Sequence, residues 1–232
     1  MIAKRLIYSF FNLIYPNPCA VCSADLAQGE EVICIPCLYK MPLTRFWDDA
    51  ENPVSQTFWG RVDIQSACAY LYFAKGGKYR PLLHKLKYQG QQEIGFYLGQ
   101  QFGLALLGTG AYQGVDTVIP VPLHPKKFRK RGYNQSECIA SGIAQGLGRE
   151  LDTGSLLRVV YTDTQTKKTR QERVANVANA FEVQHALRLQ GKHVLLVDDV
   201  ITTGATLEAC ANKLLAVENC RVSVAVLAYA SN

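Results

Sequence analysis

The sequence has 232 residues, of which 48% are hydrophobic and 19% charged, and its formal net charge at pH 7 is +6. These proportions are ordinary for a folded globular chain and exclude an intrinsically disordered one. The length suffices for one α/β domain plus a small module. The mild basic excess is compatible with phosphate-bearing partners and does not by itself demonstrate them.

The first apolar stretch, Leu6 to Tyr15, is too short to span a bilayer. Lys4 and Arg5 precede it, so a signal peptide has to be considered, but a Pro-Asn-Pro turn follows where a small-residue cleavage site would stand. We interpret the stretch as an amphipathic helix or a packing strand. We therefore expect a cytoplasmic protein with no stable membrane insertion.

Two close pairs of cysteines come next, Cys19-x2-Cys22 and Cys34-x2-Cys37, separated by eleven residues. Such pairs supply four thiolates to one tetrahedral Zn²⁺. A disulfide pair and a redox C-x2-C are the alternatives; a cytosolic setting weakens the first, and the presence of two motifs weakens the second. The pattern predicts a structural zinc site, which has no open position for catalysis. The four scattered cysteines lie in apolar segments and are interpreted as core residues: Cys68, Cys138, Cys210 and Cys220.

The remainder of the chain alternates between strand-like and helix-like patterns. The predicted strands are residues 66–73, 115–123, 192–200 and 221–230, and the predicted helices are residues 79–90, 91–108, 136–148 and 206–219. Small residues in the helix at 136–148 favour close packing. This alternation predicts an α/β fold, a parallel sheet flanked by helices, with the boundary of a small N-terminal module near residue 45.

Two adjacent carboxylates, Asp198 and Asp199, follow the buried-looking run VLLV. In a parallel α/β sheet, ligands bind beyond the carboxyl ends of the strands. A small, hydroxyl-rich turn that opens the next helix follows the acids and suits a phosphate: Thr202, Thr203, Gly204, Ala205 and Thr206. The acids then suit vicinal hydroxyls, a Mg²⁺ ion, or both, so the pattern predicts a phosphoribose site. A simple helix cap is the alternative, although one residue would suffice for that.

Two basic segments accompany the acidic strand end. The first follows a predicted strand over Val118 to Leu123 that ends in proline-rich turns, and we interpret it as a phosphate or nucleic-acid contact: Lys126, Lys127, Arg129, Lys130, Arg131, Asn134 and Gln135. The second, Arg158 to Phe181, carries Lys168, Arg170 and Arg173. Cationic groups there would stabilise the charge that develops on a pyrophosphate leaving group. The alternative for both segments is a solvated surface or loop.

Aromatic and basic residues also mix in the segment before the sheet: Tyr70, Tyr72, Phe73, Tyr79, Lys85, Lys87 and Tyr88. Three interpretations stay open for them. Such surfaces bind single-stranded nucleic acid, they form a hood over a nucleobase, or they are core aromatics with lysines that reach to solvent.

VLLVDDVITTGAT, residues 194–206, resembles the phosphoribosyl pyrophosphate signature of type I phosphoribosyltransferases. Together with the cysteine pairs, YRPLLHKLKYQG and PVPLHPKKFRKRGYNQS, it resembles the ComF family of competence-associated, phosphoribosyltransferase-like proteins. A T-x-x-Q…R-x-x-R-x-x-N…AF pattern adds to the resemblance through Thr162, Gln165, Arg170, Arg173, Asn176, Ala180 and Phe181. The chain departs from many relatives at Val159, Val160 and Tyr161, where they carry arginines, and at Lys167 and Lys168, where they carry small or apolar residues.

The resemblance implies a type I phosphoribosyltransferase-like domain over residues 46–232, preceded by a helix and zinc module over residues 1–45. It implies that Asp198 and Asp199 contact ribose hydroxyls with Mg²⁺, that residues 202–206 hold the 5′-phosphate, and that Lys168 and Arg170 assist the chemistry. The implied role is binding of phosphoribosyl pyrophosphate in DNA uptake and natural transformation, with single-stranded DNA and a helicase-like motor protein as partners. The alternative is an active phosphoribosyltransferase of nucleobase or nucleotide metabolism without a DNA role. Any base would have to be read by residues of the N-terminal half.

Overall fold

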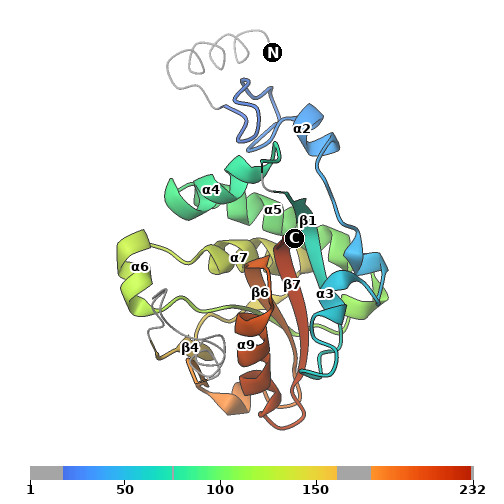
Figure 1. The fold of residues 1–232 in the computed structure, drawn as a ribbon, viewed down its shortest axis with the longest axis vertical. Coiled ribbons are helices and arrows are strands. Elements are labelled where there is room, and N and C mark those ends of the chain that lie inside the picture. The colour runs from blue at the N-terminus through green and yellow to red at the C-terminus, as the bar shows by residue number, and fades with distance from the viewer. Residues whose placement is uncertain (1–17, 75, 161–178, 231–232) are drawn as a thin grey trace.

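The computed structural model describes residues 18–74, 76–160 and 179–230. Its centre is a five-stranded sheet in the order β1-β7-β6-β2-β3, in which every neighbouring pair is parallel (Figure 1). The strands are β1 (Ala67–Phe73), β2 (Thr117–Pro120), β3 (Glu150–Leu151), β6 (His193–Ile201) and β7 (Arg221–Ala230). This arrangement confirms the predicted α/β fold with a parallel sheet.

Helices cover both faces of the sheet. In Figure 1, α9 (Ala205–Leu215) lies in front of the sheet, while α5 (Gln92–Leu107) and α7 (Gln135–Leu147) lie behind it. Because both faces are covered, the central strands are apolar without alternation: Val194, Leu195, Leu196 and Val197 of β6 are fully buried. The other helices are α2 (Ile35–Tyr39), α3 (Pro53–Gln56), α4 (Arg80–Tyr88) and α6 (Pro125–Arg131).

Glycines let α5 and α7 pack backbone against backbone. A Cβ atom added to Gly99 would lie 2.2 Å from the carbonyl oxygen of Ile139, and one added to Gly142 would lie 2.1 Å from that of Phe96. The expected close packing of the helix at 136–148 is therefore confirmed. This contact fixes the position of α7, whose N-terminus faces the carboxyl edge of the sheet.

The basic run after β2 differs from the prediction. We expected a strand to Leu123 followed by turns, but β2 ends at Pro120 and the run forms helix α6. His124 caps this helix, since its Nδ1 accepts a hydrogen bond from the Lys126 amide at 3.1 Å, and Pro125 occupies the first turn. Gly132, with φ of 84°, ends the helix. The prediction was wrong because the caps, and not apolar periodicity, define this short helix.

The remaining elements are small. Two short strands, β4 (Leu156–Arg158) and β5 (Phe181–Val183), form a separate antiparallel ladder on either side of residues 161–178, which lie outside the described residues. Short 3-10 helices cover Phe46–Asp48, Gly110–Tyr112 and Ala186–Arg188. None of the helices in the described ranges combines the length and apolar character needed to cross a bilayer. The apolar stretch from Leu6 to Tyr15 falls outside those ranges.

Candidate phosphoribose site

The acidic pair lies within strand β6 and not after it. Pairing with β7 continues past both acids, through Val200 opposite Ala228 and Ile201 opposite Tyr229. The strand predicted over residues 192–200 therefore extends one residue further, to Ile201, because β7 is long enough to continue the ladder. Only residues 202–204 separate the strand from helix α9. The acids are thus placed by the rigid edge of the sheet.

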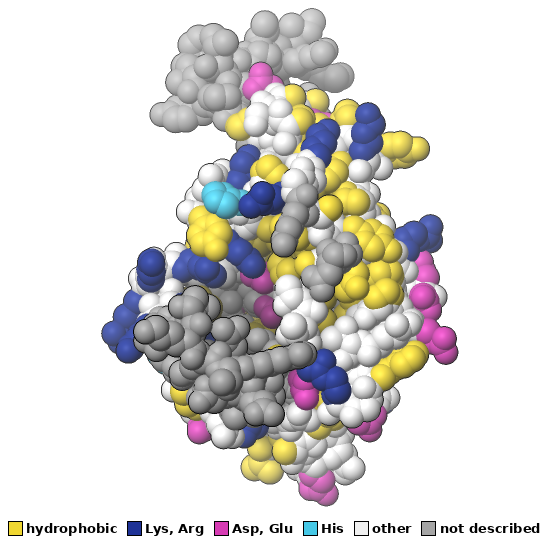
Figure 2. Space-filling model, in the orientation of Figure 1, with side chains coloured by type: hydrophobic (Ala, Val, Ile, Leu, Met, Phe, Trp, Pro, Cys, Tyr) yellow, Lys and Arg dark blue, Asp and Glu magenta, His cyan; other side chains and the backbone are white. Residues whose placement is uncertain are grey.

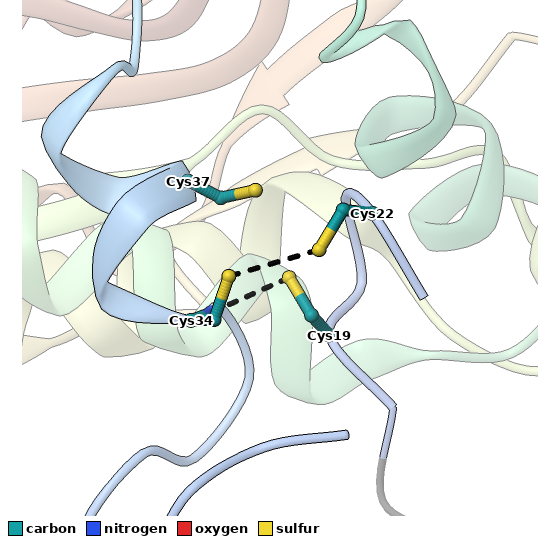
Figure 3. A group of neighbouring side chains, drawn as sticks. All are labelled: Cys19, Cys22, Cys34 and Cys37. Atoms are coloured by element: carbon teal, nitrogen blue, oxygen red, sulfur yellow. Dashed lines mark hydrogen bonds between the residues drawn. The ribbon is translucent and has the colours of Figure 1, made fainter. Parts of the chain in front are cut away.

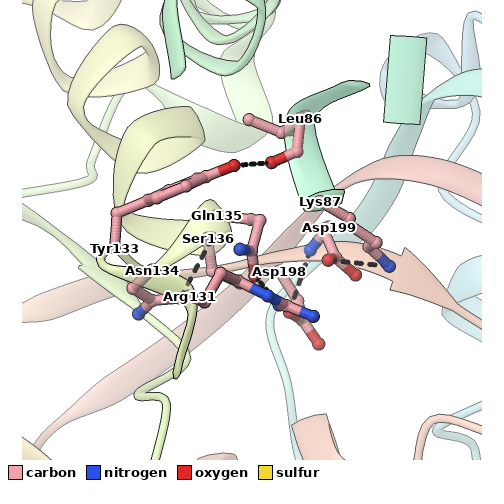
Figure 4. A network of polar contacts seen from close by, with 9 residues as sticks. All are labelled: Leu86, Lys87, Arg131, Tyr133, Asn134, Gln135, Ser136, Asp198 and Asp199. Atoms are coloured by element: carbon pink, nitrogen blue, oxygen red, sulfur yellow. Dashed lines mark hydrogen bonds and ion pairs between the residues drawn. The ribbon is translucent and has the colours of Figure 1, made fainter. Parts of the chain in front are cut away.

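Asp198 and Asp199 take different partners (Figure 4). The Oδ1 atom of Asp198 accepts hydrogen bonds from the Ser136 hydroxyl at 2.8 Å and from the Asp199 amide at 2.9 Å. The Oδ2 atom of Asp199 forms an ion pair with the Lys87 ammonium at 2.8 Å. One acid is therefore oriented by the N-terminus of α7 and the other by the last turn of α4, which eases the repulsion between the two carboxylates.

The electrostatics of the site raise the pKa of Asp198. Burial, and then the negative charge of Asp199, raise the pKa of Asp198 to about 7, against the lowering effect of the Ser136 hydrogen bond. A nearby cation of β4, Arg158, has its own pKa lowered by burial, an effect that the Asp198 carboxylate opposes. Asp198 can therefore change protonation near neutral pH, which suits a group that meets a divalent cation or a sugar hydroxyl.

The threonine turn is held by a residue from far away in the sequence. Arg61 donates hydrogen bonds to the carbonyl oxygens of Thr57 at 2.9 Å and of Thr203 at 3.1 Å, and it also pairs with Glu208 of α9. Gly204 has φ of 75°, and a Cβ atom there would lie 2.8 Å from Thr57. The turn therefore packs closely against Thr57. Thr202 and Thr203 are exposed, and Ala205 and Thr206 begin the 11-residue helix α9, whose N-terminus attracts anions.

The loop before α7 joins α4 to the acidic strand end. The Tyr133 hydroxyl donates to the Leu86 carbonyl oxygen, and Asn134 caps α7 while donating to the Val121 carbonyl oxygen at 3.0 Å. The Gln135 side chain accepts a hydrogen bond from Arg131. Its amide nitrogen is buried and has no hydrogen-bond partner among the described residues. Both polar atoms of Asn134 are engaged within the fold, whereas Gln135 keeps a donor beside the acids (Figure 4).

The predicted cationic contacts are only partly brought together. Lys126 and Arg129 are exposed on α6 and Lys127 is partly exposed, whereas Arg131 lies beside the acids and contacts Gln135 (Figure 4). The pKa of His124 is lowered by burial and then by the charges of Arg158, Lys126 and Lys127, so the edge is electropositive. Figure 2 shows Lys and Arg side chains around a hollow in which acidic side chains lie. The other predicted contacts, Lys168, Arg170 and Arg173, lie outside the described residues.

The four paired cysteines converge at one point (Figure 3). Their sulfur atoms all lie within 4.8 Å of one another, and the sulfurs of Cys22 and Cys34 are 3.7 Å apart. Tetrahedral zinc with bonds of about 2.3 Å separates its sulfur ligands by about 3.8 Å. Burial would raise the pKa of Cys19, but backbone hydrogen bonds from Cys34, Cys22 and Val21 outweigh it and lower that pKa to about 6. Burial raises the pKa values of Cys34 and Cys37, so it is the spacing of the four sulfur atoms that fits a zinc ion.

The cysteine cluster contacts α4 directly. The Lys85 ammonium donates to the Ala20 carbonyl oxygen at 3.0 Å, and the Tyr79 hydroxyl donates to the Cys37 carbonyl oxygen at 2.7 Å. Among the scattered cysteines, Cys68, Cys210 and Cys220 are buried as expected, while Cys138 is only partly buried.

The sequence did not point to three residues that contact the acids or the turn. Ser136 directly follows Asn134 and Gln135, which were predicted contacts. Its position at the start of a predicted helix could have identified it. Lys87 was considered only as part of the aromatic and basic segment before the sheet. Arg61 had no signal, since Thr203 and Glu208, the partners that join it to the turn and to α9, lie more than 140 residues away.

Comparison with known proteins agrees with this geometry. Residues 135–232 match a family model described as phosphoribosyl transferase domain. The chain is 34% identical over 138 residues to the DNA utilization protein YhgH of Shigella flexneri, covering 58% of this chain and 60% of that protein. It is 34% identical over 151 residues to Competence protein F of Haemophilus influenzae, covering 61% of this chain and 64% of that protein.

The match thus spans about 60% of the length of these curated relatives. A solved structure, a glutamine phosphoribosylpyrophosphate amidotransferase from B. subtilis, aligns with 61% of this chain and 30% of its own at 19% identity and a TM-score of 0.41. The chain therefore carries a phosphoribosyl transferase domain over residues 135–232 and is a relative of the ComF competence proteins.

Proposed function

We propose that the acidic strand end binds phosphoribosyl pyrophosphate together with Mg²⁺, as the phosphoribosyltransferase-type site of a protein that serves DNA uptake. One observation carries this proposal: two carboxylates stand at the end of a buried strand, one short turn before an anion-attracting helix N-terminus. Residues 202–206 would hold the 5′-phosphate. Asp198 and Asp199 would hold the ribose hydroxyls and the metal, which supplies charge neutralisation.

The chemistry that this site supports is displacement at the anomeric carbon. The bond to the pyrophosphate oxygen breaks, the pair of electrons leaves with pyrophosphate, and an acceptor atom forms the new bond. Cationic groups would stabilise the leaving group: Lys126, Lys127, Arg129 and Arg131 of α6 and, from the segment outside the described residues, Lys168, Arg170 and Arg173. Positioning and charge stabilisation then account for the rate, without a nucleophile from the protein.

Isothermal titration calorimetry with phosphoribosyl pyrophosphate and Mg²⁺ tests the site. The double variant Asp198→Asn, Asp199→Asn should lose binding. Asp63→Asn, which removes an exposed carboxylate elsewhere, should bind like wild type. Equal binding by the double variant and wild type would contradict the assignment.

The names of two relatives, DNA utilization protein YhgH and Competence protein F, support the DNA role. Single-stranded DNA is the partner that the basic helix α6 favours, and a helicase-like motor protein rests on the family resemblance alone. The competing proposal is an active phosphoribosyltransferase of nucleobase or nucleotide metabolism. Pyrophosphate release with free nucleobases, without loss of transformation in a deletion strain, would favour that alternative.

We also propose that Cys19, Cys22, Cys34 and Cys37 hold a structural zinc ion, in a module over residues 1–45 that precedes a domain over residues 46–232. The converging sulfurs support this proposal. Metal analysis of the purified protein should find one zinc per chain, and the Cys19→Ser, Cys22→Ser variant should lose it. A wild-type content well below one zinc per chain would contradict the assignment.

A further inference from the structure

An exposed aromatic side chain, Tyr88, ends helix α4 beside the acidic strand end. The residue is 68% exposed. The guanidinium carbon of Arg131 lies 5.6 Å from the centre of its ring, and the His84 ring lies 5.1 Å away, tilted by 47°. A cation over the ring and a histidine one turn earlier hold the tyrosine in place. Its exposure is therefore that of a positioned ring and not that of a loose surface side chain.

The surroundings of Tyr88 are rigid as well. Lys85 and Lys87, beside it on α4, already have partners within the fold. Lys85 donates to the Ala20 carbonyl oxygen, and Lys87 pairs with the Asp199 carboxylate. Leu86, between them, accepts the hydrogen bond of Tyr133. Three consecutive residues thus anchor the last turn of α4 to three other parts of the fold. A ring at the end of such a turn loses little further freedom when a ligand binds to it.

The charge next to Tyr88 is positive. Arg131 ends α6, and its last turn also carries Arg129 and Lys130, both exposed. The acid that lies closest along α4, Asp199, is already paired with Lys87. Figure 2 shows Lys and Arg side chains along this flank of the molecule. A phosphate backbone that follows α6 would therefore meet Arg129, Lys130 and Arg131 before it reaches the ring.

We propose that Tyr88 is a stacking platform for an unpaired base of a single-stranded nucleic acid whose phosphates follow α6. Aromatic rings stack on the faces of bases regardless of sequence, and a basic surface beside them tracks the backbone. A base inside a duplex is already stacked and paired, so its faces are not available. The proposal rests on the single-stranded DNA binding proposed above, whereas Tyr88 itself is not among the residues assigned to phosphoribosyl pyrophosphate.

Fluorescence anisotropy with a short labelled oligothymidylate tests the platform. Tyr88→Ala should weaken binding about tenfold, the usual cost of one lost stacking contact. Tyr88→Trp should bind like wild type, since the ring is replaced by another. Tyr39→Ala is the matched control, because Tyr39 is 89% exposed on the cysteine module and should be neutral. Unchanged binding by Tyr88→Ala, or an equal loss in Tyr39→Ala, would overturn the proposal.

Two further arms identify the form of the ligand. Duplex DNA of the same sequence should bind through α6 alone and should be insensitive to Tyr88→Ala; an equal loss for duplex would contradict stacking on an unpaired base. Free thymidine monophosphate should bind far more weakly than the oligomer, and comparable affinity would contradict a polynucleotide ligand. Calorimetry with phosphoribosyl pyrophosphate should be unchanged in Tyr88→Ala, so failure of the platform and failure of the phosphoribose site are separable.

Discussion

The Lys87 ammonium lies 2.8 Å from the Asp199 carboxylate, and this ion pair joins the last turn of α4 to the end of strand β6. Two residues earlier, Lys85 fastens the same helix to the backbone of the cysteine module. One short helix therefore connects the cysteine cluster, the loop before α7 and the acidic strand end. The arrangement of the candidate site depends on that helix as much as on the sheet.

The ion pair between Lys87 and Asp199 should contribute measurably to stability. Its side chains are only 24% and 16% exposed, so Lys87→Met leaves the largely buried Asp199 carboxylate without its ion-pair partner. We expect a loss of about 1–3 kcal/mol in the free energy of unfolding at pH 8. Urea denaturation measures this. Arg45→Met breaks an ion pair whose side chains are 76% and 46% exposed and should change stability little. Equal effects of the two substitutions would show that burial does not matter here.

Asp198 should make stability depend on pH in the direction opposite to a typical acid. Its pKa is raised to about 7 in the fold, whereas the unfolded chain titrates near about 3.9. Between these values the folded state binds the proton more strongly, so its contribution to stability is present at low pH and is lost as pH rises through 7. Asp198→Asn should therefore stabilise the protein more at pH 8 than at pH 5. Denaturation curves at the two pH values test this, and an identical gain at both would contradict the raised pKa.

Arg61 should affect ligand binding without touching the ligand. It donates to the carbonyl oxygen of Thr203 and pairs with Glu208, so Arg61→Ala frees the turn that we propose binds the phosphate. We expect phosphoribosyl pyrophosphate to bind about tenfold more weakly, by calorimetry. Arg149→Ala is the control, since Arg149 also donates to a backbone carbonyl, that of Gln113, away from this turn. A similar weakening in both variants would argue for a general loss of stability.

Close packing of α5 on α7 should be intolerant of a single added carbon. Gly99→Ala places a Cβ atom 2.2 Å from the Ile139 carbonyl oxygen, so the two backbones must move apart. We expect destabilisation of about 2–3 kcal/mol in thermal unfolding. Gly108→Ala at the end of α5, where the nearest atom would be 3.7 Å away, should be nearly neutral. The comparison separates the clash from the intrinsic effect of removing a glycine.

Much of the fold could be predicted from the sequence because the patterns that indicate strands, helices and cysteine pairs are local. Uninterrupted apolar runs such as VLLV predicted buried parallel strands, and glycines in the helix at 136–148 predicted its close contact. The C-x2-C pairs predicted a four-sulfur cluster that the fold brings together. Helix α6 was missed because seven residues without apolar periodicity leave only their caps as a signal.

The sequence by itself therefore determined four of the five strands of the sheet, the cysteine cluster and the position of the acidic pair at a strand end, since each follows from residues close together along the chain. Only the tertiary structure decided which groups face those acids. Ser136, Lys87 and Arg61 reach Asp198, Asp199 and Thr203 across 62, 112 and 142 positions of the chain. Contacts of that kind are set by the packing of whole helices on the sheet, and no local pattern carries them.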